Sequence, residues 1–216
     1  MKLTPGSRKE RLALAQHALG RMSRRGLAKL GPKKRAFDPI QLLLKAQRGR
    51  MQTLLPIKYE RMAGSPFAFF RGSVSIMAAE LGAEKHSGLT VQLCGDAHVQ
   101  NMGSFESPDG RIVFDINDFD ETIAGPWEWD VKRMSVSIVM AGIAAGHGHG
   151  PCREAATAFS VRYVNTMKEL ADEPILSAAR HRLHGLNRTQ AGSAALKQAA
   201  RAQPQDREQI HRILVG

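Results

Sequence analysis

The sequence predicts an α/β fold of the α+β kind, mainly helical and with a short β-hairpin. Apolar residues recur at helical spacing in several segments, of which residues 128–146 and 151–170 are long examples. Residues 90–94 are instead apolar and rich in β-forming side chains, so we expect a short buried strand there. Turn-forming residues at 108–110 then precede a returning strand at 111–114.

Helices are also predicted in the first part of the chain. Residues 8–19 have helical spacing. Asp38 and Pro39 are typical of the N-cap and the first position of a second helix. Another helix is expected over residues 73–83, after the aromatic run of residues 67–70, which we expect to pack in the core. The apolar face of the second helix is expected to include Leu42, Leu43, Leu44, Met51, Leu54 and Leu55.

The second part of the chain is predicted to hold two longer helices. Residues 128–146 predict a buried helix, and Pro151 is expected to open another that reaches Leu170. Between them, Gly146–Gly150 is the nearest candidate for a glycine-rich phosphate cradle, and we interpret it as a flexible linker. After Ser177 we expect a poorly anchored helix. Buried positions of the last long helix are expected at Ala155, Phe159, Val161, Tyr163 and Met167.

Composition excludes several classes of protein. A hydrophobic content of 43% is typical of a globular chain. The two cysteines, Cys94 and Cys152, are too few for a disulfide framework or a cysteine-rich zinc site. No apolar run reaches the length of a membrane span, and no signal-peptide core follows Met1. We therefore expect a soluble cytoplasmic protein without a membrane partner.

Positive charge is concentrated at the N-terminal end. Residues 1–50 hold fourteen Lys or Arg against Glu10 and Asp38, a net charge of +12, while the whole chain carries +11. Residues 1–35 are expected to be a basic extension, mobile or attached as a loose helix. Contact of this basic arm with nucleic acid is the less favoured alternative, because no aromatic residue precedes Phe37 to stack on a base.

An acidic segment lies inside this basic chain. Residues 91–130 hold nine Asp or Glu and one basic residue, Arg111. Crowded carboxylates repel one another, and their pKa values rise unless a counter-charge is present. Mg²⁺ supplies such a charge and prefers the oxygens of Asp and Asn side chains. The segment therefore predicts a metal site.

Three residues of this segment match the roles needed for kinase-type phosphoryl transfer. In that chemistry a loop Asp takes the proton of the attacking hydroxyl, and an Asn and a later Asp hold the metal ions. Asp96, Asn101 and Asp115 occur in this order at the two ends of the expected hairpin. We expect their side-chain oxygens to face one cavity, with His98 orienting the loop or contacting a phosphate.

Some assignments stay open between two interpretations. Asp118 or Asp120 is expected to be a further metal ligand, or else part of a solvated turn that caps the next helix. The loop around Asp96 is alternatively a plain loop, because Asp and Asn favour turns. Arg71 follows an apolar cluster, and such an Arg often pairs with phosphate, so it is our candidate for cofactor binding.

Four motifs together resemble a known family. They are SPFAFFRG at residues 65–72, GDAHVQNMG at 95–103, FDINDFDET at 114–122 and GPWEWDVKR at 125–133. In this order they are similar to the bacterial "domain of unknown function 2252" family, from about residue 36 to about residue 190. That family in turn resembles the protein-kinase-like superfamily, near the aminoglycoside phosphotransferases.

The resemblance implies a kinase-like phosphotransferase that uses ATP and Mg²⁺. It implies that Asp96 is the catalytic base, and that Asn101 and Asp115 are metal ligands. Asp130 takes the place of the Asp that anchors the catalytic loop through backbone N–H groups, with ordinary placement in a helix's first turn as the alternative. Cys94 stands where the kinase relatives usually have a His, so that role is absent or moves to His98.

Other parts of a kinase site are not recognisable. The resemblance places a Gly-rich segment and a phosphate-binding Lys downstream of the Asp motifs, and neither Lys58 nor Lys85 follows a Gly-rich turn. We therefore expect a truncated member: a kinase-like catalytic-lobe fragment at residues 36–190 and a poorly anchored segment at 191–216. Such a chain is expected to bind ATP poorly and to turn over little.

Two functions follow from these expectations. The leading one is an ATP- and Mg²⁺-dependent phosphotransferase acting on a small-molecule or protein acceptor, active alone or with a complementing polypeptide. The alternative is a non-catalytic folded protein, in which the acidic loop only supports the core and the basic arm makes contacts. Fold kinship does not decide between them, because function belongs to the site.

Overall fold

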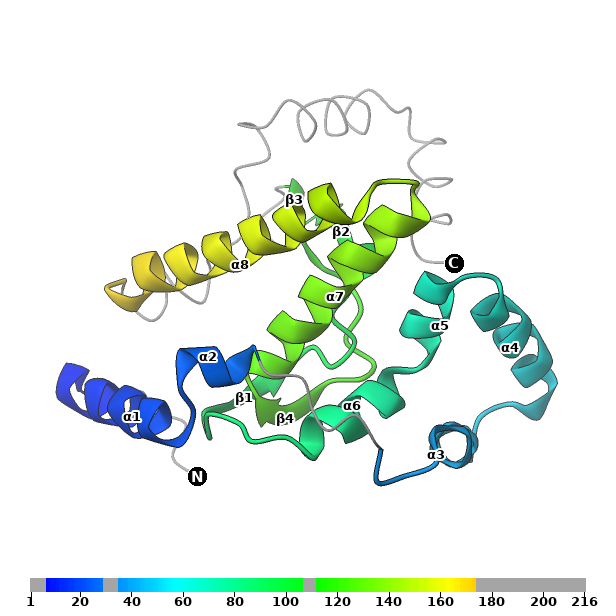
Figure 1. Ribbon diagram of the computed structural model, residues 1–216, viewed down its shortest axis with the longest axis horizontal. Helices are drawn as coiled ribbons and strands as arrows, with labels where there is room; N and C mark the ends of the chain where they lie inside the picture. Colours follow the sequence, from blue (N-terminus) through cyan, green and yellow to red (C-terminus); the bar gives the residue numbers. More distant parts are fainter. Residues whose placement is uncertain (1–6, 29–34, 107–111, 174–216) are drawn as a thin grey trace. The chain divides into compact units, whose positions relative to one another are not determined.

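The computed structural model describes residues 7–28, 35–106 and 112–173 (Figure 1). These residues form a mixed α+β protein that is mostly helical, with two small antiparallel sheets, which confirms the expected fold class. The chain divides into two compact units. Of the described residues, the first unit comprises 7–28, 35–99 and 119–161, and the second comprises 100–106, 112–118 and 162–173.

The first unit begins with two helices, α1 (Arg8–Arg21) and α2 (Arg24–Leu27). The Ser7 side chain and Glu10 form a capping box at the start of α1, which satisfies backbone N–H groups that have no partner within the helix. The helix expected over residues 8–19 is therefore confirmed.

Helix α3 (Pro39–Ala46) begins as expected, because the Asp38 carboxylate accepts a hydrogen bond of 2.8 Å from the backbone N–H of Ile40. It ends earlier than its apolar pattern suggested. Gly49 has a φ of +83°, a left-handed conformation that interrupts the helix. The later apolar residues lie instead in η1 (Gln52–Leu54) and α4 (Leu55–Ala63). The expected apolar face is buried at Leu43 but exposed at Leu44, Met51 and Leu54.

Helices α5 (Pro66–Gly72) and α6 (Val74–Gly82) follow. The Ser65 hydroxyl caps α5 by accepting a hydrogen bond of 3.0 Å from the N–H of Ala68. The aromatic run was expected in the core, and Phe67 is buried there, but Phe69 is 45% exposed. The run is helical, so its side chains point in different directions around the axis.

The sheet of the first unit pairs β1 (Thr90–Leu93) with β4 (Ile123–Pro126), antiparallel, with Thr90 opposite Pro126. The sequence did not predict β4, because residues near Glu121 suggested a solvated turn. The expectation that all of β1 is buried is also wrong: only Leu93 of the strand is buried. A sheet of two strands leaves most of its surface open to solvent.

Helix α7 (Glu128–Ala144) is buried at few of its positions, whereas the sequence suggested a buried helix. Its buried residues are Glu128, Arg133, Met134 and Ser137. Helix α8 (His149–Ala171) crosses from the first unit to the second. The burial expected at three of its positions is wrong, because Ala155, Val161 and Met167 are exposed.

The second unit contains the expected hairpin. Strand β2 (Met102–Glu106) pairs with β3 (Ile112–Ile116), antiparallel, so that Gly103 lies opposite Asp115. Val113 of β3 is fully buried. The expected turn at 108–110 and the segment expected after Ser177 lie outside the described residues.

In the described ranges of the chain, no helix is both long enough and apolar enough to span a membrane.

Candidate active site

The loop that carries Asp96 is held at its start by Asp130, a residue in the first turn of α7. The backbone N–H groups of Cys94 and Gly95 donate hydrogen bonds of 2.7 and 3.1 Å to the two carboxylate oxygens of Asp130. Asp96 comes directly after these two residues, so its position depends on the same contacts. The role of Asp130 as the anchor of a catalytic loop stays a prediction.

Gly95 allows the chain to turn sharply out of β1. Its φ is +85°, and a Cβ atom at this position would lie 2.0 Å from the carbonyl oxygen of Glu121. A side chain here would be strained by the backbone conformation and would also collide with the backbone at Glu121. The glycine therefore lets the segment before β4 lie directly against the loop.

Helix α7 holds the loop at a second point. The N–H of Val99 donates a hydrogen bond of 2.9 Å to the hydroxyl of Ser137, a fully buried side chain. Asp130 and Ser137 are seven residues apart on α7, about two turns, and so lie on the same side of the helix. One face of α7 thus fixes both ends of the segment from Cys94 to Val99.

Between these two anchors, Arg133 of α7 forms an ion pair with Asp96. Its Nε and Nη2 atoms lie 2.8 and 2.5 Å from Oδ1 of Asp96. The guanidinium group also donates a hydrogen bond of 3.1 Å to the backbone carbonyl of Phe70. Its central carbon lies 4.3 Å from the centre of the Phe70 aromatic ring. Its Nη1 lies 3.4 Å from the sulfur of Met77. The Arg133 side chain is 3% exposed, so Asp96 is the counter-charge of a buried cation.

His98 is buried next to the other oxygen of Asp96. Its Nε2 lies 3.5 Å from Oδ2 of Asp96 and 3.4 Å from Nε of Arg71. A neutral imidazole nitrogen either donates or accepts, so Nε2 cannot serve both neighbours in one protonation state. In the structure Nε of Arg71 donates to Nε2 of His98, and Oδ2 of Asp96 lies at ion-pair distance from the same nitrogen. Arg71, the candidate for cofactor binding, is an exposed residue beside this pair.

The pKa values of Asp96 in the loop and of Asp130 in α7 are shifted in opposite directions. Burial alone would raise the pKa of Asp96, but the hydrogen bond from His98 and the charge of Arg133 outweigh it, and the pKa lies below its usual value. Burial raises the pKa of Asp130, and the N–H groups of Cys94 and Gly95 only partly oppose that rise. Asp96 is therefore the more strongly ionised of the two.

We predict that Asp96 titrates below its reference pKa of 3.8 and that Asp130 titrates above it. Because the folded state lowers the pKa of Asp96, this group contributes stability above pH 3.8 that is lost as the pH falls through its folded-state pKa. Asp130 has the opposite sign: its ionised form costs stability, and that cost disappears on acidification. Carboxyl ¹³C NMR titration of the folded chain measures both values, and Asp130 titrating before Asp96 on raising the pH would contradict the prediction.

Three of the other predicted site residues belong to the second unit, whereas Asp120 lies in the first unit and is exposed. Asn101 is buried at the end of η2 (Val99–Asn101), and its carbonyl accepts a 3.0 Å hydrogen bond from the N–H of Asn117. Asp115 lies in β3, where its carboxylate accepts a 2.8 Å hydrogen bond from the N–H of Ile116, while Asp118 is exposed. Because Asp96 belongs to the first unit, the expected convergence of these residues with it stays a prediction.

The metal prediction is likewise still open. Among the residues that the structure describes, no group of three or more His, Cys, Asp or Glu side chains is arranged to hold a metal ion. The expected ligands for Mg²⁺ include the amide of Asn101, and Mg²⁺ is usually bound through one or two carboxylates together with water and phosphate oxygens. The oxygen chemistry of Asn101 and Asp115 fits this cation.

Sequence reasoning missed Arg133 and Ser137, which hold the loop from α7. Their spacing was the available signal, since Asp130, Arg133 and Ser137 fall at three- and four-residue intervals on one helix face. Lys58 of α4, which follows no Gly-rich turn, donates a 3.3 Å hydrogen bond to the buried side chain of Gln47. Burial is the largest cause of its lowered pKa, and the charge of Asp96 opposes that lowering.

Comparison with known proteins identifies the family. A family model described as "Uncharacterized protein conserved in bacteria (DUF2252)" matches residues 50–214, which is most of the chain. The protein belongs to this family. No curated protein and no solved structure matches the chain.

Proposed function

We propose that this protein is a kinase-like phosphotransferase, dependent on ATP and Mg²⁺, in which Asp96 is the catalytic base. The observation that carries the proposal is the state of Asp96: an ionised carboxylate, 20% exposed, on a loop that α7 ties down at both ends. Such positioning suits phosphoryl transfer, where the protein contributes mainly placement and electrostatics.

We assign different roles to the two carboxylate oxygens of Asp96. Oδ1 accepts hydrogen bonds from Nε and Nη2 of Arg133, which hold this oxygen in place. Oδ2, on the side of His98, is the oxygen that we assign to the acceptor hydroxyl. With a lowered pKa, Asp96 is a weak base, so it orients the hydroxyl first. It takes the proton as the hydroxyl oxygen bonds to the γ-phosphorus of ATP and the bond to the ADP oxygen breaks.

The cofactor residues follow from the family resemblance and from ligand chemistry. Asn101 and Asp115, with Asp118 as a further candidate, would hold Mg²⁺ through oxygen atoms. Bound there, the cation would neutralise phosphate charge. Arg71 is exposed beside His98 and is our candidate to contact a phosphate oxygen through its planar guanidinium group. The acceptor would be a small molecule or a protein in the cytoplasm.

The burial of Arg133 favours a second candidate function. In that alternative the protein is not catalytic, and Asp96 serves only as the counter-ion of Arg133. The basic arm of residues 1–35 would then make the functional contacts. A related possibility within the first proposal is a catalytic-lobe fragment that needs a complementing polypeptide, since no glycine-rich cradle was recognised in the sequence.

The proposal is tested by nucleotide binding and turnover of the purified chain. We expect weak, Mg²⁺-dependent ATP binding by calorimetry and slow ADP formation. Asp96→Asn, compared per folded molecule, should reduce ADP formation by about 100-fold or more, because it removes the proton acceptor. Asp172→Asn, an exposed carboxylate at the end of α8, is the matched control and should leave the rate unchanged.

Three results distinguish the alternatives. Absence of both ATP binding and ADP formation would favour the non-catalytic function, and ADP formation that survives Asp96→Asn would exclude Asp96 as the catalytic base. Rapid turnover by the chain alone would show that no complementing polypeptide is needed.

A further inference from the structure

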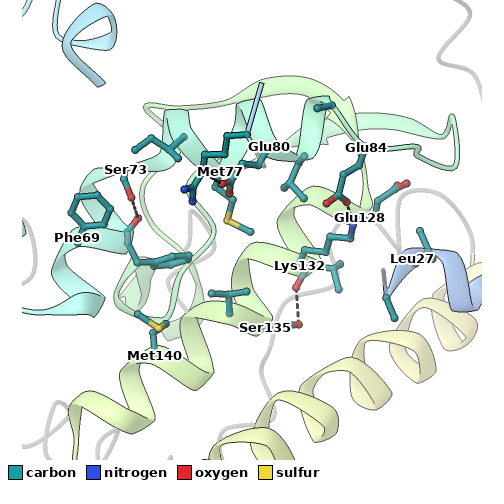
Figure 2. A pocket seen from close by; sticks show the side chains of 18 of the residues that line it. Leu27, Phe69, Ser73, Met77, Glu80, Glu84, Glu128, Lys132, Ser135 and Met140 are labelled. Atoms are coloured by element: carbon teal, nitrogen blue, oxygen red, sulfur yellow. Dashed lines mark hydrogen bonds and ion pairs between the residues drawn. The ribbon is translucent and has the colours of Figure 1, made fainter. Parts of the chain in front are cut away.

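A large cavity in the first unit lies on the side of α7 that does not hold the Asp96 loop. Its volume is about 1030 Å³, and its walls come chiefly from α5, α6 and α7. Figure 2 shows Met77 of α6 together with Ser135 and Met140 of α7 around this space. The volume is that of a site for a small organic molecule.

The lining of the cavity is predominantly apolar. The side chains that give it this character include Phe69, Ile76, Met77, Val131, Val136 and Met140. Two of them keep considerable exposed surface, since Phe69 is 45% and Val136 is 40% exposed. Apolar contact with a ligand would therefore remove exposed hydrocarbon from water.

The charged residues of the lining all have partners within the protein. Lys132 pairs with Glu84 at 2.9 Å, as the dashed line in Figure 2 indicates, and Arg35 pairs with Glu80 at 2.5 Å. Glu128 accepts hydrogen bonds of 2.6 and 3.0 Å from the N–H and hydroxyl of Ser87. A charged ligand would lose its hydration without gaining a free counter-charge, so the cavity favours a neutral one.

Three serine hydroxyls of the lining define what polar group the ligand carries. The hydroxyls of Ser73, Ser135 and Ser160 donate to the backbone carbonyls of Phe70, Val131 and Ala156 at 3.3, 2.8 and 2.9 Å. A hydroxyl has one proton but two lone pairs. Because all three protons are used in these hydrogen bonds, the hydroxyls are left as acceptors, and a matching ligand donates.

We propose that this cavity binds a neutral, largely apolar small molecule that carries an N–H or O–H donor. A protein segment is a poorer occupant, because every peptide unit brings an N–H and a C=O that need partners in an apolar site. Three serine hydroxyls cannot satisfy such a segment. The proposal does not depend on the phosphotransferase activity, although Phe70 and Met77 of the lining also contact Arg133.

The test uses two fluorescent probes that differ by one charge. N-phenyl-1-naphthylamine is neutral and apolar and has one N–H donor, whereas 1-anilinonaphthalene-8-sulfonate adds a sulfonate to the same rings. We expect the neutral probe to bind saturably, one molecule per chain, with a Kd of about 10 µM, and the sulfonate to bind about tenfold more weakly or less. Fluorescence titration of the whole chain measures both.

Variants assign the binding to this cavity. Val136→Trp fills it from a partly exposed position and should weaken the neutral probe about tenfold or more. Val164→Trp, at a valine of α8 that is 47% exposed and outside the lining, is the matched control and should have no effect. Ser135→Ala removes an acceptor without adding bulk and should weaken the probe about threefold, which keeps the test valid where Val136→Trp does not fold.

The proposal is overturned by absent or unsaturable binding, by equal binding of the sulfonate, or by equal effects of the two Trp variants. Sedimentation of the unliganded chain adds one more outcome. Self-association that Val136→Trp abolishes would assign the surface to a second copy of the chain and would also overturn the proposal.

Discussion

Replacing Asp96 with Asn is expected to destabilise the folded protein by about 3–5 kcal/mol, a large effect for a single substitution. The reason is the position of Arg133, whose side chain is 3% exposed and carries its charge next to Asp96. Asn keeps the shape of the side chain but removes the counter-charge, so a buried cation is left uncompensated. Urea unfolding, followed by circular dichroism, measures the change in the free energy of unfolding.

A second substitution separates the charge effect from a general disturbance. In the double variant Asp96→Asn with Arg133→Met, the buried charge is removed as well, and Met is a flexible apolar chain that suits the contacts with Phe70 and Met77. We expect its stability to lie within about 1 kcal/mol of the wild type, because apolar replacements of buried ion pairs are often neutral. A double variant that is less stable than Asp96→Asn would contradict this account of the site.

The exposed ion pair between Arg35 and Glu80 provides a control. Its side chains are 52% and 38% exposed, so solvent screens their attraction. Glu80→Gln is therefore expected to cost about 0.5 kcal/mol or less. Unlike Glu80→Gln, Asp96→Asn is expected to lower the amount of folded protein as well as remove the proposed base. Its rate of ADP formation is therefore compared per folded molecule.

Local signals made much of the fold predictable. The N-cap at Asp38, the turn residues before β3 and the helical spacing of residues 8–19 each act within a few positions of the chain, and each predicted its element. Strand β4 (Ile123–Pro126) was missed because it is short and polar residues precede it. It becomes a strand through its pairing with β1, a contact about thirty positions away that no local pattern encodes.

The candidate site was predictable in its acidic residues but not in its supporting ones. Asp96 and Asp130 could be identified because they belong to an acidic segment within a chain of net positive charge. Arg133 did not, because the chain is rich in arginine and a single one carries no signal until the structure shows it buried against Asp96. Burial depends on the packing of α5, α6 and α7 together, which is a property of the whole unit.

Removing the carboxylate of Asp130 is the other change with a large expected effect. Asp130→Ala should cost about 2–4 kcal/mol, since the N–H groups of Cys94 and Gly95 each lose a charge-assisted hydrogen bond. Their amide hydrogens should then exchange with solvent faster than in the wild type, and faster relative to amides elsewhere in the sheet. Hydrogen exchange followed by NMR measures this directly.

Asp130→Asn is the matched comparison for this prediction. Its single carbonyl oxygen can accept one of the two N–H groups, and it avoids the burial of charge that raises the pKa of Asp130. We therefore expect it to cost less than half as much as Asp130→Ala and to leave one of the two amides protected. Unchanged exchange at both Cys94 and Gly95 in Asp130→Ala would show that β1 and Ser137 alone hold the loop, and that Asp130 is an ordinary residue of a helix's first turn.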